Sequence, residues 1–129
     1  MAEFNWQLPE TVQDGIKYSI VYLPMDEIRL RITGTGRIHG AAEKRPWISN
    51  QHRINDIWIG EGITEIGDMA FFDHSKLKRV WLPETMSKIG NEVFARCPKL
   101  EEVIFERTPD RSSHIDIGHD ALPEWALDY

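Results

Sequence analysis

The stretch ITEIGDMAFF, residues 63–72, returns in altered form as MSKIGNEVFA, residues 86–95. Both versions place an apolar residue, an Ile-Gly pair, two variable residues, a small residue and an aromatic residue in the same order. Self-similarity at a fixed spacing indicates a repeat architecture, in which each copy forms one coil of a stack. One coil of this length cannot bury its apolar face alone, so we expect the copies to pack on one another.

The spacing between these two copies, from residue 63 to residue 86, also recurs on both sides of them. Three sets of apolar residues recur at it: Ile54, Leu77 and Leu100; Ile57, Val80 and Val103; Ile59, Leu82 and Phe105. Apolar residues two apart predict a strand with one buried face, and strands of successive coils should lie parallel. A third, imperfect copy resumes at residues 117–122, later than the spacing predicts, and the excess falls in the expected loop 107–116.

The remainder of each copy predicts a turn and an inward-facing aromatic column. The glycine after each isoleucine allows a tight turn or a close contact between coils. Residues 68–73 and 91–96 suit one short helical or 3-10 turn each, with Asp68 or Asn91 able to cap it. The corresponding side chains should stack from coil to coil, and they are Phe71, Phe94 and the smaller Leu122.

Residues 57–105 resemble the BspA-like leucine-rich repeat family, which repeats roughly IGxxAFxxCxxLxxIxIPxxV. Cys97 stands at the family's recurring cysteine, and His74 replaces it in the preceding coil. Pro83 matches the family's proline, whereas Gly60 departs from it.

Upstream, LRITGTGRIHG (30–40) and RPW (45–47) also resemble the segment that often precedes such repeats. The resemblance covers about residues 28–122. It implies a right-handed solenoid of strands and short turns, and a binding role instead of catalysis; the family is often found at cell surfaces.

We therefore expect a β-rich α/β fold, a leucine-rich-repeat solenoid of about three coils with parallel strands and short helical or 3-10 turns. Residues 1–15 would form an N-terminal arm, 16–53 a β-hairpin cap and connector, and 54–129 the repeats with a C-terminal cap. The hairpin is predicted from two strand-like runs joined by the turn PMDE, residues 24–27. Three aromatic and apolar side chains would anchor the connector and close the last coil, namely Trp47, Trp125 and Leu127.

Composition narrows the function classes. The length suits one domain, and the formal net charge of −6 arises entirely after residue 100, where acidic residues far outnumber arginines. Duplex nucleic acid is disfavoured as a ligand, because phosphate neutralisation needs clustered cations. The acidic end is either a solubilising tail or a patch that docks on a basic protein surface.

The sequence offers little for catalysis or metal binding. A single cysteine, Cys97, excludes an internal disulfide and a cysteine-based zinc site. The segment GTGRIHG lacks the third glycine of a dinucleotide-binding loop. His114, Asp116 and His119 lie close in sequence, and Ser113 precedes them, but they form no recognised ligand set or triad. We expect no enzyme activity and no cofactor, and keep metal-dependent or hydrolytic chemistry at residues 114–119 as an alternative.

The expected cellular setting follows from two features of the sequence. No apolar run approaches the length that a helix needs to cross a bilayer, so we expect no membrane span. Residues 1–15 have neither the basic nor the apolar part of a secretory signal, which favours a cytoplasmic protein. Secretion would require a signal outside this sequence.

The residues between the buried strand positions should form an exposed ladder. They are Trp58, Trp81 and Ile104, flanked on the same face by Asp56, Arg79 and Glu102. Tryptophan with charged neighbours is typical of a protein-binding hot spot, and an exposed apolar strip usually has a function. These six residues are our candidate site.

We expect a non-enzymatic protein–protein interaction module, and several readings of the ladder stay open. The N-terminal hairpin or arm could cover the ladder, two copies could meet on it as a homodimer, or a foreign protein, a peptide or a carbohydrate could bind it. An alternative function is a small acidic inhibitor, as some phage anti-defence proteins are, that occludes a nucleic-acid-binding enzyme.

Overall fold

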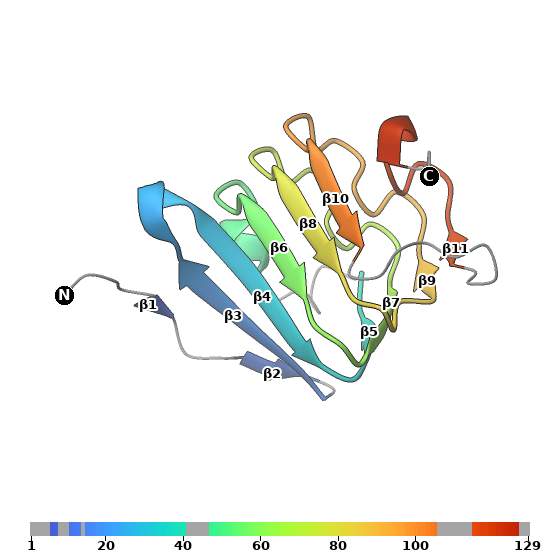
Figure 1. Ribbon diagram of the computed structural model, residues 1–129, viewed down its shortest axis with the longest axis horizontal. Helices are drawn as coiled ribbons and strands as arrows, with labels where there is room; N and C mark the ends of the chain where they lie inside the picture. Colours follow the sequence, from blue (N-terminus) through green and yellow to red (C-terminus); the bar gives the residue numbers. More distant parts are fainter. Residues whose placement is uncertain (1–5, 8–10, 14, 41–46, 106–114, 127–129) are drawn as a thin grey trace.

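The computed structural model describes residues 6–7, 11–13, 15–40, 47–105 and 115–126 and shows two sheets joined by turns (Figure 1). The larger sheet contains β1 (Trp6–Gln7), β2 (Thr11–Gln13), β3 (Ile16–Tyr22), β4 (Ile28–Gly34), β6 (Asp56–Ile59), β8 (Arg79–Leu82) and β10 (Glu102–Phe105). The smaller sheet contains β5 (Gly36–Ile38), β7 (Ile63–Ile66), β9 (Lys88–Ile89) and β11 (Asp116–Ile117). Short 3-10 helices are η1 (Pro24–Asp26), η3 (Ile48–Asn50) and η4 (Glu124–Ala126).

The repeat forms coils that stack in register. Strands β6, β8 and β10 pair in parallel, with Ile57 opposite Val80 and Val80 opposite Val103. The smaller sheet repeats this arrangement, with Ile66 opposite Ile89 and Ile89 opposite Ile117. The predicted leucine-rich-repeat solenoid with parallel strands is therefore confirmed.

The N-terminal hairpin continues the larger sheet. Strands β3 and β4 pair antiparallel around η1, and β4 then pairs in parallel with β6. Strand β5 likewise pairs in parallel with β7, so residues 28–38 already follow the path of a coil. The expected division into a cap and connector (16–53) and repeats (54–129) remains a prediction.

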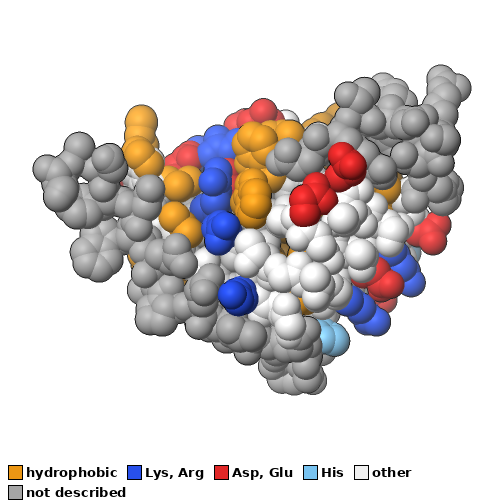
Figure 2. Space-filling model, turned by 60° about the horizontal axis from the view of Figure 1, so that its bottom comes forward, with side chains coloured by type: hydrophobic (Ala, Val, Ile, Leu, Met, Phe, Trp, Pro, Cys, Tyr) orange, Lys and Arg blue, Asp and Glu red, His pale blue; other side chains and the backbone are white. Residues whose placement is uncertain are grey.

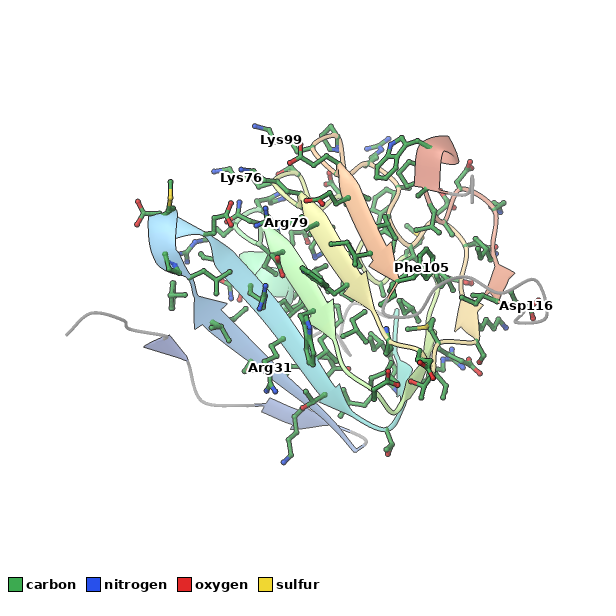
Figure 3. All side chains as sticks on the ribbon, in the orientation of Figure 1. Arg31, Lys76, Arg79, Lys99, Phe105 and Asp116 are labelled. Carbon is green, nitrogen blue, oxygen red and sulfur yellow. The ribbon has the colours of Figure 1, made fainter. Side chains whose placement is uncertain are left out.

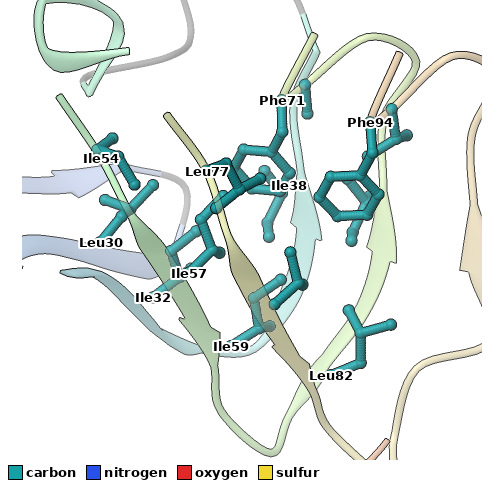
Figure 4. Close-up of a cluster of buried hydrophobic side chains, with 14 of the residues drawn as sticks. Leu30, Ile32, Ile38, Ile54, Ile57, Ile59, Phe71, Leu77, Leu82 and Phe94 are labelled. Atoms are coloured by element: carbon teal, nitrogen blue, oxygen red, sulfur yellow. The ribbon is translucent and has the colours of Figure 1, made fainter. Parts of the chain in front are cut away.

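The core lies between the two sheets and the turns (Figure 4). Alternation along β4, β6 and β8 sends one set of side chains inward, and Leu30, Ile57, Val80 and Leu82 are all fully buried. Burial of this apolar surface is the main force that holds the coils together. Each coil supplies a part of the core that only its neighbours can cover.

The predicted aromatic column is present and begins earlier than expected. The rings of Phe71 and Phe94 stack with centroids 5.6 Å apart, and both are buried. Trp47 extends the column, with its ring 5.3 Å from Phe71 and 5.1 Å from Tyr18. Leu122 is buried in the following coil, as predicted.

The segments at residues 68–73 and 91–96 differ from the predicted helical or 3-10 turns. They are hydrogen-bonded turns in which Met69, Asp73, Glu92 and Arg96 adopt left-handed backbone angles, with φ between 53° and 60°. This conformation turns backbone groups toward the next coil: the Phe71 N–H donates to the Val93 carbonyl at 3.1 Å. These bonds between coils add to bonds within each turn, such as the one from the Phe72 N–H to the Met69 carbonyl at 3.2 Å.

Candidate partner-binding face

The candidate site lies on the outer face of the larger sheet, where two columns of side chains cross the strands. The outer column consists of Arg31, Trp58, Trp81 and Ile104, which are opposite one another on β4, β6, β8 and β10. The charged column consists of Arg29, Asp56, Arg79 and Glu102 on the same strands. All four members of the outer column are half-buried. Figure 2 shows basic and hydrophobic side chains next to each other on one side of the molecule.

Asp56 is the centre of the charged column and is fully buried. Its carboxylate accepts hydrogen bonds from Arg29 Nε at 2.7 Å and Arg79 Nε at 3.2 Å. The Trp81 indole N–H donates to the same carboxylate at 3.4 Å. The sequence predicted Asp56 as an exposed member of the site; the structure corrects this, because the side chains that it binds cover it.

The network reaches the hairpin through Arg79. The Arg79 guanidinium also pairs with Glu27, at the end of the η1 turn, and Lys78 lies 3.6 Å from that carboxylate. Partial burial lowers the pKa of Arg79, but its hydrogen bonds and charge pairing with Asp56 and Glu27 outweigh this and raise it above its usual value. Asp56 and Glu27 therefore hold a charged Arg79 against the sheet.

Arg31 and Trp58 form a second contact, by a different interaction. The Arg31 guanidinium carbon lies 5.3 Å from the centroid of the Trp58 ring. A cation at this position over the ring face is attracted by the negative charge of the π-system. Gly60 makes room for the ring, because a Cβ there would lie 3.0 Å from a ring carbon of Trp58. A side chain at residue 60 would therefore require the Trp58 ring to shift.

The hairpin does not cover the outer column. Strand β3 lies beside β4 in the same sheet, and the described parts of the arm, β1 and β2, pair with β3. Strands β3 and β4 thus separate them from β6, which carries Trp58. Residues 1–5, 8–10 and 14 of the arm lie outside the described residues.

Two residues singled out in the sequence occupy equivalent places in successive coils. The buried His74 ring bonds the Phe72 carbonyl through Nδ1 at 3.1 Å and accepts from the Trp47 indole N–H through Nε2 at 3.2 Å, which fixes a neutral tautomer. Cys97 donates its thiol to the carbonyls of Phe71 and Ala95. Burial raises the pKa of Cys97 to about 11, so this side chain is a thiol and a poor nucleophile at neutral pH.

The sequence-predicted cluster at residues 114–119 is only partly described. Ser113 and His114 lie outside the described residues; Asp116 begins β11, and the His119 backbone N–H donates to Asn91 Oδ1 at 3.0 Å. Within the described ranges, no three potential metal-ligating side chains come together. No helix among the described residues is long and apolar enough to cross a membrane.

A known structure shares the fold. A crystal structure of a leucine-rich repeat protein from Eubacterium ventriosum aligns over 88% of this chain with a TM-score of 0.70 and 23% identity. A leucine rich cell surface protein from Faecalibacterium prausnitzii aligns less well, over 76% with a TM-score of 0.46 and 19% identity. This chain spans 28% of the first protein and 32% of the second.

Sequence comparisons identify the family. No curated protein matches the chain significantly. The family model described as "BspA type Leucine rich repeat region (6 copies)" matches residues 47–117, which is more than half of the sequence and includes β6, β8 and β10. The chain therefore belongs to the BspA-type leucine-rich repeat family.

Proposed function

We propose that this protein is a non-enzymatic interaction module that binds a protein partner through the outer face of β4, β6, β8 and β10. Family membership supports an interaction role in general, because stacked repeats present extended binding surfaces. The single observation that carries the specific proposal is the pair Trp58 and Trp81, half-buried and opposite each other on neighbouring parallel strands.

The energetics of recognition favour this face. Tryptophan and arginine dominate the binding energy of many interfaces, because they combine a large apolar area with polar atoms that hold one orientation. Here Asp56 already holds Trp81, and Arg31 lies over Trp58. Little side-chain freedom is therefore lost when a partner binds, which lowers the entropic cost of association.

The test is a double substitution, Trp58→Ser with Trp81→Ser, compared with Trp125→Ser. The sequence predicted that Trp125 closes the last coil, but the structure leaves it 49% exposed on η4, outside the larger sheet, so it is a matched control; Leu127 lies outside the described residues. Proteins captured from a native lysate by the unsubstituted chain should be lost with the double variant and kept with the control. Circular dichroism must show that both variants are folded.

Two results would contradict the proposal. Undiminished capture by a folded double variant would place binding elsewhere. The double variant could instead unfold while the Trp58→Phe and Trp81→Phe single variants fold and capture the partner normally. If cross-linking then also finds no contact of either ring with the partner, these two side chains have a purely structural role.

A further inference from the structure

The outer face of the larger sheet is electrically asymmetric. Arg29 and Arg31 lie at its β4 end, whereas the exposed Glu102 lies at its β10 end. Figure 3 labels Arg31 on β4, at the basic end of this face, and Arg79 on β8. This basic end stands out on a chain with a formal net charge of −6.

The cations of this face differ in their pairing. Arg29 and Arg79 both bind the carboxylate of Asp56, and Arg79 also binds Glu27. Arg31 instead lies over Trp58, and it has no carboxylate partner among the described residues. Its guanidinium therefore places N–H donors next to the Trp58 ring.

A guanidinium held against an indole is suited to one ligand chemistry. Its planar donors bind a carboxylate through two parallel hydrogen bonds, and the adjacent ring accepts an apolar side chain. Phosphate shares the first property, but the rest of the column, Trp81 and Ile104, is uncharged and half-buried. The column thus pairs one anion position with an apolar strip.

The dimensions of the column fit an extended peptide. Strands in a sheet are about 4.8 Å apart, so the distance from Arg31 to Ile104 across three strand spacings is roughly 14 Å. Alternate side chains of an extended chain are about 6.7 Å apart on one face, so those at i, i+2 and i+4 cover the column. An acidic side chain at one end would meet Arg31, and apolar ones would meet the tryptophans and Ile104.

We propose that the ligand of this face is an acidic segment of a partner protein, with an Asp or Glu over Arg31 and apolar side chains over Trp58 and Trp81. This inference rests on the proposed function and names the class of partner. The charge asymmetry sets the direction of the segment across the sheet, because Glu102 at the β10 end repels a second carboxylate there.

A random-peptide phage library selected on the folded chain tests this, with counter-selection on the Trp58→Ser, Trp81→Ser variant. Enriched sequences should carry an Asp or Glu two residues from an aromatic or aliphatic residue. A labelled peptide with that pattern should bind about tenfold or more weaker to Arg31→Gln, as expected for the loss of a charge-assisted hydrogen bond. Arg31→Glu should prefer the same peptide with Lys in place of its acid.

Arg96→Gln is the matched control, because Arg96 also lies over an aromatic ring, Phe72 at 5.6 Å, but in a turn outside this sheet. Its affinity for the peptide should be unchanged. Tryptophan-dependent enrichment of neutral or basic peptides would overturn the inference and leave the proposed function standing. Tryptophan-dependent binding of a neutral polysaccharide with no enriched peptide would overturn both, as would peptide binding that is indifferent to the two tryptophans.

Discussion

At the residue scale, the glycine of each coil is required by the approach of the preceding coil. A Cβ at Gly67 would lie 2.7 Å from the backbone nitrogen of Gly40, and one at Gly90 would lie 2.7 Å from that of Asp68. Asp68 Oδ1 uses this closeness to accept the Asn91 N–H at 2.8 Å. Its predicted capping role within one coil is thus replaced by a bond between coils.

Gly90→Ala should therefore destabilise the fold. The new methyl group would meet Asp68 backbone and carboxylate atoms, and overpacking of this kind costs about 1–3 kcal/mol. Chemical denaturation followed by circular dichroism measures the loss. Gly60→Ala is the control with a smaller expected cost, because its nearest obstacle is the end of the Trp58 side chain. Equal stability of Gly90→Ala and the unsubstituted protein would contradict a close contact between coils.

The sequence predicts the position of a residue in the fold when its contact partners recur at the spacing of the repeat. Phe71 and Phe94 do so, and their stacking is confirmed. Asp56 could not be placed in the same way, because one of its partners, Arg29, lies upstream of the repeats that the sequence reveals. Its burial therefore had no pattern from which to be predicted.

At the element scale, the two-residue alternation determines which side chains of β6 and β8 face the core, whereas the conformation of each turn depends on the neighbouring coil. Ile57 and Ile59 on β6 are buried and Trp58 between them is half-buried, as the two-residue period predicts. Met69 and Glu92 adopt left-handed angles without being glycine, and local sequence does not predict this. Bonds from Met69 N–H to the Asn91 carbonyl and from Glu92 N–H to the His119 carbonyl compensate for that conformation.

The charged column joins β4, β6 and β8, so Asp56→Ala should destabilise more than an ordinary surface change. Removing one partner of a buried ion pair costs about 3–5 kcal/mol, and the lower end applies because both guanidinium groups are partly exposed. The control is Glu102→Ala, an exposed change in the same column that should cost little. Thermal unfolding compares the two variants, and similar melting temperatures would contradict a structural role for Asp56.

At the scale of the whole molecule, one stack runs from the hairpin to the last coil. Tyr18 and Trp47 continue the aromatic column of Phe71 and Phe94, and β4 continues the parallel sheet. The sequence predicted the repeats and the hairpin separately, since the connector makes β4 and β6 lie further apart along the chain than β6 and β8 do. The outer face is therefore wider than the repeats alone suggest, and Arg31 belongs to it.

The central claim is that this stacking places Trp47 inside the molecule and leaves Trp58 and Trp81 accessible on one face. Fluorine NMR of protein labelled with 5-fluorotryptophan, assigned by single Trp→Phe variants, measures each indole separately in the presence of a soluble paramagnetic gadolinium complex. We predict broadening of the Trp58, Trp81 and Trp125 resonances and a sharp Trp47 resonance, in line with its 2% exposure. Resonances of Trp58 and Trp81 as well protected as that of Trp47 would contradict the account.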